Sequence, residues 1–550
     1  MQATQHNQNK YLPVRRLTQG ELTHHIRQLN DKLSGIDIAG YHRNHRESIL
    51  PKYPRHIRAS LMREYFEIAG PTRTWPDGPG AGKYDSWAKA NGNLRRRDEQ
   101  LQSAKVHLAF SEDSIQSKAG RCAAICRHIA KSSRSITEAF SRCCVFAESE
   151  AVTPPVLKSN IVTVEGAVNR MCCRLWWRRA LRTTFARSAE NRMRELGLVS
   201  NHAGIYASDD TVNRRLEQRK RNRQMLEGLL AINDLGEAFS LAEISDRNIS
   251  NPKIRRCEVM ARLAGLEEFA RGTRLVCDHY TLTVPSRFHC VNSTGHKNPN
   301  FESSTPRDSH DWLKKNWTRI RSKLARDNIS AFGVRIAEPH HDGTAHWHVL
   351  VFSSQKSRLP TRRIFRHHML QDTPNERGAQ NHRVRITPID YRRGSATGYI
   401  AKYISKNIDG QNVGRDFEDN DNINCKDNVV RVEAWASTWG IRQFQFFGAP
   451  PIGPWRELRR IRESLRTGLE RFRRAVDKGD WRRYLTLMGG TCRRIADYPV
   501  LLWRQLCDGP SRYGDPPGYK TIGVTHGDDQ ICTRDRIWAI VPIDPLESCQ

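Results

Sequence analysis

The spacing of hydrophobic residues changes near residue 273, and this change separates regions of different structure. From about 116 to 272, apolar residues recur at intervals of three and four among many arginines, which predicts amphipathic helices. From 273 to about 412, similar helical segments alternate with short runs rich in β-branched and aromatic residues, such as LVCDHYTLTVP at 275–285. Strands joined by hairpins and separated by helices predict an α+β fold with a central antiparallel sheet and flanking helices.

These patterns divide the chain into five predicted regions. Residues 1–115 are polar, with many Gly and Pro residues, and are expected to be partly mobile. Residues 116–272 form a basic helical region suited to binding DNA, and 273–412 form the α+β domain. A second basic helical region covers 413–500, and the last segment, 501–550, is expected to be an irregular tail. The central domain is thus preceded and followed by mainly helical basic regions.

The charge balance indicates a polyanionic partner. The chain of 550 residues carries 90 Lys and Arg residues against 59 Asp and Glu residues, a formal net charge of +31. The basic residues are interleaved with Trp, Tyr and Phe and do not form one polybasic tail, so they are expected to lie on the faces of folded domains. This pattern favours a nucleic acid over a membrane surface. Solvated faces of a helical bundle are the alternative interpretation of the basic helices.

Two absences and the cysteine pattern indicate a cytoplasmic protein. No run approaches the roughly 18 consecutive apolar residues of a membrane span, and the sequence begins without the apolar core of a secretory signal. The 14 cysteines are scattered and include adjacent pairs, which suits free thiols in a reducing compartment. We therefore expect no membrane association.

The segment RIAEPHHDGTAHWHVLVF at 335–352 contains the most informative pattern in the chain. Side chains alternate between the faces of a strand, so His346 and His348 must share one face, while Trp347 lies on the other. Two adjacent imidazoles on one face can bind a metal ion together. The alternative is that both histidines merely line a half-buried sheet.

The register of the hairpin determines which residue joins the two histidines. The residues HDG at 341–343 suit a three-residue loop in which Gly343 adopts the left-handed conformation, and this register places Glu338 opposite His346. A two-residue loop would instead place Glu338 beside Trp347, on the wrong face. The metal hypothesis therefore depends on the three-residue turn.

With that turn, Glu338, His346 and His348 form a site of two histidines and one carboxylate with open positions for water or substrate. His340 or His341 would replace Glu338 if the turn differed. A metal with open positions in a nucleic-acid-binding chain indicates phosphodiester chemistry.

That chemistry requires a nucleophile, and the segment SATGYIAKYISKNIDG offers two tyrosines. Tyr399 and Tyr403 lie four residues apart on a predicted helix, so both hydroxyls project from one face. A phenol with a pKa of about 10 needs activation to attack. The metal would polarise the phosphate, and Lys402 or Lys406 would stabilise the developing negative charge. Taken alone, the two tyrosines would more often be packing residues.

Three motifs together carry a family resemblance: HYTLTVP at 279–285, EPHHDGTAHWHVLVF at 338–352 and YIAKYISKN at 399–407. In these motifs the chain resembles the bacteriophage replication gene A proteins, which are rolling-circle replication initiators of the HUH endonuclease superfamily. The resemblance extends from about residue 165 to 448. It implies that 273–412 is an HUH endonuclease domain.

The resemblance also implies residue roles and partners. His346 and His348 match the histidines of the metal motif around the bulky Trp347, and Tyr399 and Tyr403 match the paired catalytic tyrosines. One tyrosine would cut single-stranded origin DNA with the help of Mg²⁺ or Mn²⁺, retain the 5′ end as a phosphotyrosine and free a 3′-OH. The second tyrosine would cut the regenerated origin after one round. The chain contains no credible nucleotide-binding loop, so a host helicase would unwind the DNA, with host polymerase and single-strand binding protein.

Three rival functions remain open from the sequence. A conjugative or mobilisation relaxase would share the chemistry, although the order of metal motif before tyrosine helix is typical of replication initiators. A non-catalytic DNA-binding protein would explain the charge but assign no role to the histidine pair. A zinc hydrolase that uses metal-bound water would need neither tyrosine and would form no covalent adduct.

Overall fold

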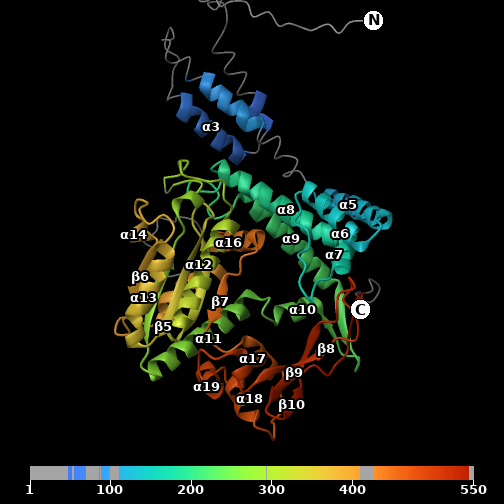
Figure 1. Ribbon diagram of the computed structural model, residues 1–550, viewed down its shortest axis with the longest axis vertical. Coiled ribbons are helices and arrows are strands. Elements are labelled where there is room, and N and C mark those ends of the chain that lie inside the picture. Colours follow the sequence, from blue (N-terminus) through green and yellow to red (C-terminus); the bar gives the residue numbers. More distant parts are fainter. Residues whose placement is uncertain are drawn as a thin grey trace, which may run out of the picture. The chain divides into compact units, whose positions relative to one another are not determined.

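The computed structural model describes residues 48–52, 55–69, 86, 88–99, 111–292, 294–408 and 425–543 (Figure 1). The chain separates into two compact units, residues 1–102 and 103–550. Much of the region predicted to be mobile, 1–115, lies outside the described residues. Within them, no helix combines the length and apolar character needed to cross a membrane, and no disulfide joins the described cysteines.

The described part of the first unit is a pair of helices after a short turn. It comprises η1 (Leu50–Lys52), α3 (Arg55–Ala69) and a second helix over 88–99. The Tyr65 hydroxyl donates a hydrogen bond to Asn91 Oδ1 over 3.1 Å, and Arg97 pairs with Glu64 at 2.8 Å. These two contacts join the helices of this unit.

The second unit begins with the basic helical region. Its helices are α5 (Glu112–Ser132), α6 (Ile136–Ser149), α7 (Val164–Met171), α8 (Arg174–Glu195), α9 (Asp209–Glu227), α10 (Leu241–Asp246) and α11 (Pro252–Gly272). Buried Trp177 and Leu181 of α8 pack with α5, α6 and α7 in a separate small core. In α9, by contrast, Thr211 is the one buried residue, so most of this helix is available for solvent or a ligand.

The central sheet of the second unit has five antiparallel strands. They are β3 (Val276–Leu282), β4 (Ala331–Pro339), β5 (Ala345–Ser353), β6 (Val384–Pro388) and β7 (Phe444–Phe447), in the order β6-β3-β5-β4-β7. The predicted α+β fold class with a central antiparallel sheet is confirmed. Strand β5 is central and buried along its whole length, which places the two histidines inside the protein.

Helices cover both faces of this sheet. The helices and turns around it are η2 (Ser286–Phe288), α12 (Pro306–Arg326), α13 (Gln355–Leu370), α14 (Ala379–His382), α15 (Ala396–Ile408) and α16 (Cys425–Trp439). Trp347 and Val349 pack with α12, α13 and α16 on one face. Leu350 and Phe352 pack with α11 and α15 on the other. The alternation along β5 therefore directs His346 and His348 toward the face that α11 and α15 cover.

The C-terminal part adds short helices and two small sheets. Helices α17 (Ile452–Leu458), α18 (Glu470–Asp477) and α19 (Trp481–Leu487) and turn η3 (Ile495–Asp497) precede β8 (Leu501–Leu506), β9 (Tyr519–His526), β10 (Asp529–Cys532) and β11 (Trp538–Pro542). Figure 1 shows α17, α18 and α19 gathered near β9 and β10. β8, β9 and β10 form one sheet, and β11 pairs with β1 (Leu229–Asn233) of a hairpin completed by β2 (Ala238–Ser240).

Two of the predicted regions differ from the structure. The tail 501–550 is not irregular where it is described, because it contains β8 to β11. The region 116–272 is mainly helical and also contains the short strands β1 and β2. The sheet does not end at 412, because β7 at 444–447 pairs with β4. Strands β7 and β11 pair with β4 and β1, which lie more than a hundred residues away, so local spacing carries little signal of these two pairings.

Candidate active site

The hairpin between β4 and β5 has the predicted three-residue turn. The Gly343 N–H donates to the His340 carbonyl at 2.8 Å, and the His340 N–H donates to the Thr344 carbonyl at 2.7 Å. Gly343 has a φ of +78°, a left-handed conformation that glycine adopts without strain. Glu338 accordingly lies opposite His346 in the ladder, so this register prediction is confirmed.

Buried Asp342 stabilises the turn from within. Its carboxylate accepts hydrogen bonds from the Thr344 N–H at 3.0 Å, the Thr344 hydroxyl at 2.9 Å and the Cys290 N–H at 3.1 Å. Burial alone would raise the pKa of Asp342, but His289 at 3.2 Å and the charge of Arg194 lower it below its ordinary value. The turn is therefore built around a buried carboxylate that accepts hydrogen bonds from both Thr344 and Cys290.

Glu338, His346 and His348 meet on the face of the sheet that α15 covers. One potential ligand atom from each of the three side chains lies within 4.8 Å of those of the other two. The two Nε2 atoms of His346 and His348 are 3.0 Å apart, and His348 Nε2 is 3.7 Å from Glu338 Oε2. All three side chains are buried. The structure thus brings the predicted ligands together, and their role as metal ligands remains a prediction.

The electrostatics of this cluster suit a divalent cation. Burial lowers the pKa values of His346 and His348 well below the ordinary value, so both imidazoles are neutral and offer lone pairs at neutral pH. Burial also raises the pKa of Glu338, which lacks an arginine partner within the described residues. Buried His346 Nδ1 has no hydrogen-bond partner among them either. A cation would offset the desolvation of the carboxylate, so these residues fit a metal ion.

Helix α15 brings two tyrosines to the same cluster. Its N-terminus is capped from α11 by Glu267, whose carboxylate accepts from the Ala396 N–H at 2.9 Å and the Thr397 N–H at 2.8 Å. A carboxylate at this end satisfies otherwise unpaired N–H groups and interacts favourably with the helix dipole. The cap therefore fixes where the helix begins relative to the sheet, and with it the positions of Tyr399 and Tyr403.

Both tyrosine rings lie against the histidines. The Tyr403 ring stacks on the His348 ring with 3.9 Å between centroids, and the rings of Tyr399 and Tyr403 are 6.5 Å apart. Both are half-buried. Burial raises the pKa of Tyr403 above its ordinary value, and the neighbouring Tyr399 and Glu338 raise it further. A phenol in this position needs a cationic group nearby to react as a nucleophile.

The two predicted lysines occupy different environments. Lys402 Nζ lies 5.2 Å from the Tyr399 ring centroid and 5.0 Å from that of Tyr403, so it is placed to stabilise charge on either phenol. Lys406 Nζ lies over the Tyr206 ring at 4.9 Å, and its charge favours the ionised form of Glu338. The two lysines thus differ in their aromatic neighbours, while the charges of both favour the ionised form of Glu338.

His279 is a site residue that the sequence reasoning did not assign. It lies on β3, with its ring 4.8 Å from that of Tyr399, 5.7 Å from that of Tyr403 and 5.3 Å from that of His348. Burial lowers the pKa of His279 to about 3, and its Nε2 has no partner within the described ranges. Its motif, HYTLTVP, was visible in the sequence, but only the pairing of β3 with β5 places this ring in the site.

A polar relay from α15 to Glu338 was also missed. The Asn407 side-chain amide donates to Glu338 Oε1 and to the Tyr403 carbonyl, the latter over 2.5 Å. Gln443 in turn donates to Asn407 Oδ1 at 3.0 Å. The spacing of Tyr403 and Asn407 indicated a shared helix face, but nothing local connected either residue to Gln443, which directly precedes β7.

The antiparallel sheet presents two histidines and a carboxylate to a helix that carries two tyrosines. This arrangement defines an α+β protein with a candidate centre for phosphodiester chemistry. The chain belongs to the bacteriophage replication gene A protein (GPA) family, whose model matches residues 108–411. The predicted family resemblance is confirmed, and the match includes all seven predicted site residues.

Individual relatives agree with this assignment. The chain is 37% identical over 388 residues to the replication gene A protein of Escherichia phage 186, covering 68% of this chain and 56% of that protein. It is 36% identical to the probable replication protein P12 of Pseudoalteromonas phage PM2, covering 66% and 57%. It is 34% identical to a probable replication endonuclease from a prophage-like region of Salmonella paratyphi A, covering 67% and 48%. The chain thus spans about half the length of these relatives. No solved structure matches it.

Proposed function

We propose that this chain is a site-specific single-strand DNA endonuclease and strand transferase that initiates rolling-circle replication of a phage genome. The observation that carries the proposal is the placement of Tyr399 and Tyr403 beside the Glu338, His346 and His348 cluster. The names of its relatives, which include replication proteins and probable replication endonucleases, support the same assignment.

In the proposed reaction, a tyrosine hydroxyl attacks a phosphorus atom of the origin DNA. A bond forms between the phenolic oxygen and phosphorus, and the bond from phosphorus to the 3′ oxygen breaks. The phenol loses its proton, and the departing 3′ oxygen gains one. The products are a 5′-phosphotyrosine and a free 3′-OH that a polymerase can extend. Because one phosphoester replaces another, the step requires no ATP.

The residues around the tyrosines have separate proposed roles. Mg²⁺ or Mn²⁺ bound by Glu338, His346 and His348 would polarise the scissile phosphate. Lys402 stabilises negative charge on the attacking phenol, since its ammonium lies about equally close to both rings. Asn407 orients Glu338 by its hydrogen bond to Oε1.

Two tyrosines allow the cycle to close. After one round of synthesis, the second tyrosine attacks the regenerated origin and releases a new 3′-OH. That hydroxyl attacks the first phosphotyrosine, which reseals the displaced strand as a circle and frees the first phenol. Unwinding and synthesis would be supplied by a host helicase, polymerase and single-strand binding protein in the cytoplasm of the bacterial host.

The proposal is tested by incubating the protein with single-stranded origin DNA labelled on the 5′ side or the 3′ side of the cut. With Mg²⁺ or Mn²⁺, the label on the 3′ side should remain attached to the protein after denaturation, and the other label should appear on a free fragment that ends in a 3′-OH. Cleavage without an attached strand would indicate a hydrolase that uses metal-bound water. Binding without cleavage would indicate a non-catalytic DNA-binding protein.

The relaxase alternative shares this chemistry and is separated by biological context. If the chain is an initiator, a plasmid that carries its origin should replicate when the chain is supplied with the host proteins. If it is a relaxase, the same plasmid should be mobilised by conjugation and should not replicate.

A further inference from the structure

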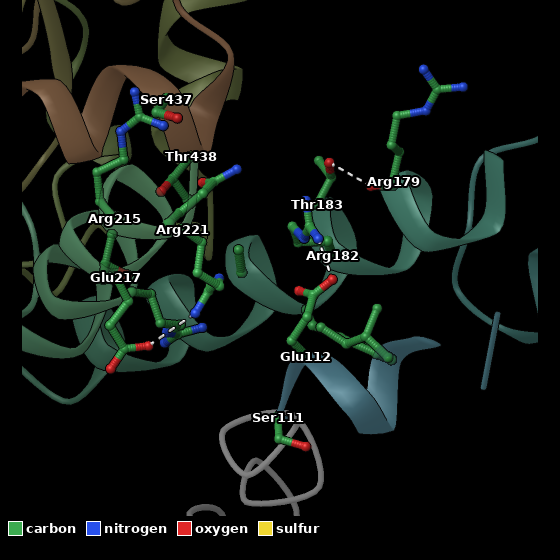
Figure 2. A pocket seen from close by; sticks show the side chains of 16 residues that line it. Ser111, Glu112, Arg179, Arg182, Thr183, Arg215, Glu217, Arg221, Ser437 and Thr438 are labelled. Atoms are coloured by element: carbon green, nitrogen blue, oxygen red, sulfur yellow. Dashed lines mark hydrogen bonds and ion pairs between the residues drawn. The ribbon is translucent and has the colours of Figure 1, made fainter. Parts of the chain in front are cut away.

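An arginine-lined cleft lies apart from the tyrosines, between helices α8 and α9. Its volume is about 510 Å³, and the last residues of α16 and the first of α5 complete its wall. Figure 2 shows Arg215 and Arg221 of α9 on one side and Arg179 and Arg182 of α8 on the other. We call this feature the arginine cleft.

The arginine cleft is strongly positive. Five arginines line it against two glutamates, namely Arg179, Arg182, Arg214, Arg215 and Arg221 against Glu112 and Glu217. Ser437 and Thr438 add hydroxyl groups at the α16 end (Figure 2). Guanidinium groups and hydroxyls are the side-chain groups that bind phosphate oxygens most effectively.

Part of this positive charge is not used by the fold. Arg182 pairs with Glu112, and Arg215 pairs with Glu433 at 2.8 Å. In contrast, Arg179 contacts the Tyr513 hydroxyl at 3.3 Å, and Arg214 donates to the Asp210 carbonyl at 3.2 Å. Neither forms an ion pair with a carboxylate in the part of the chain that the structure describes.

Two guanidinium nitrogens of the cleft are also buried without a hydrogen-bond partner. They are Arg182 Nε and Arg214 Nη2, and they lack partners among the described residues. An unpaired buried donor on a charged group is costly, and native proteins rarely retain one without a ligand or water to satisfy it. Two of the five guanidinium groups of the cleft thus keep a donor that no described residue satisfies.

Helix α16 connects the arginine cleft to the candidate active site. Its Glu433 pairs with Arg215 of α9, and its Trp435 indole donates to the Gly343 carbonyl in the turn between β4 and β5 at 2.7 Å. The same helix packs against α15, which carries the tyrosines. The cleft and the tyrosines thus belong to one packed unit with direct side-chain links.

We propose that the arginine cleft binds the phosphate backbone of single-stranded DNA that flanks the segment held at the tyrosines. The inference rests on the proposed function, which makes DNA the polyanion of this chain. Arginines on two facing helices suit successive phosphates of a strand better than one small anion. Contacts to phosphates carry no sequence information, so we expect binding in the cleft to be independent of base sequence.

The test measures the binding of a fluorescent single-stranded oligonucleotide at a series of salt concentrations, by anisotropy. Arg179→Gln combined with Arg214→Gln removes two charges without breaking an ion pair with a carboxylate. If each arginine neutralises one phosphate, the slope of log affinity against log salt should become shallower by about 1.4, or about 0.7 for each contact. The loss should be equal for origin and scrambled sequences.

The matched control is Lys220→Gln, since Lys220 is an exposed residue of α9 that does not line the cleft. It should leave affinity and slope close to those of the wild type. Arg179→Lys combined with Arg214→Lys retains both charges and should recover most of the slope. If the double Gln variant is not folded by circular dichroism, exposed Arg179→Gln alone replaces it, with an expected change in slope of about 0.7.

The outcomes separate the arginine cleft from the nuclease function. An affinity and slope equal to those of Lys220→Gln would overturn the cleft proposal even if cleavage were normal. A loss confined to the origin sequence would also overturn it, because the cleft would then read bases. A shallower slope in a protein that never forms a covalent adduct would support the cleft and reject the nuclease. With saturating DNA, the variant should form as much adduct as the wild type.

Discussion

The Asn407 side-chain amide donates a hydrogen bond to Glu338 Oε1, which joins the tyrosine helix directly to the candidate metal cluster. Such a partner orients a ligating carboxylate, and its loss typically costs about 10- to 100-fold in metal affinity or activity. Asn407→Ala should therefore weaken Mn²⁺ binding, measured by calorimetry, and excess metal should restore adduct formation.

The control for this prediction is Asn381→Ala, at an exposed position of α14. It should bind Mn²⁺ as the wild type does. If Asn407→Ala lost activity while its metal affinity stayed normal, the role of Asn407 in orienting Glu338 would be rejected.

Replacing His346 or His348 should abolish DNA cleavage while DNA binding persists. His346→Ala and His348→Ala should each abolish adduct formation, because each removes a proposed metal ligand. The affinity for single-stranded DNA should change little, since it comes mainly from phosphate contacts of the basic surface. Gel analysis of adducts and anisotropy measure the two properties separately. The control is His382→Ala, at an exposed position. Full cleavage by the double variant His346→Ala, His348→Ala would contradict the metal proposal.

Replacing one tyrosine should have a different effect on adduct formation from replacing both. Tyr399→Phe and Tyr403→Phe should each retain one covalent cut, because the other hydroxyl lies one helical turn away. Neither should complete cleavage, transfer and resealing on a circular substrate. The double variant should bind metal and DNA but form no adduct, because phenylalanine keeps the packing and loses only the nucleophile. Normal adduct from the double variant would show that another residue is the nucleophile.

The raised pKa of Tyr403 predicts a pH dependence for the variant that relies on it. The ionised phenol is the reactive form, so a pKa above the ordinary value of 10.0 leaves very little of it at neutral pH. In Tyr399→Phe, the rate of adduct formation should therefore rise by about tenfold per pH unit through neutral pH, as long as phenolate formation limits the rate. Single-turnover rates between about pH 6 and about pH 9 measure this slope, and a flat profile would contradict it.

The buried carboxylate of Asp342 predicts a loss of stability at low pH. Its pKa is depressed in the folded protein, so the stabilisation is present above the ordinary value of 3.8 and is lost as pH falls through and below that value. Asp342→Asn should lower the free energy of unfolding by about 2 kcal/mol near neutral pH, because buried donors lose a charged acceptor. Urea unfolding at about pH 7 and about pH 3.5 should show this difference shrink in acid. Exposed Asp535→Asn should show little difference at either pH.

Short-range patterns were sufficient to predict the core of the candidate site. The alternation along β5 placed His346 and His348 on one face, and the turn chemistry of Gly343 set Glu338 opposite His346. Helical spacing likewise predicted the shared face of Tyr399 and Tyr403. Each of these relationships depends on residues fewer than ten positions apart, where backbone geometry alone determines which side chains meet.

Relationships between distant segments could not be predicted in the same way. His279 enters the site through the pairing of β3 with β5, and Gln443 enters it through the segment that leads into β7. Glu267 reaches the N-terminus of α15 from more than a hundred residues away. These contacts follow from tertiary packing. The local periodicity of a segment carries no information about which distant segment packs against it.

Helix α15 is held at both ends, by Glu267 at its first residues and by the contact of Asn407 with Glu338 near its last. The separation of Tyr399 and Tyr403 along the helix axis is then set by the backbone, at about 6 Å for four residues. If both phenols attach DNA as proposed, their attachment points lie at a fixed spacing on one helix. In the proposed cycle, the 3′-OH released at one tyrosine must reach the phosphotyrosine on the other, so the flexibility of the bound strand would set how readily resealing follows the second cut.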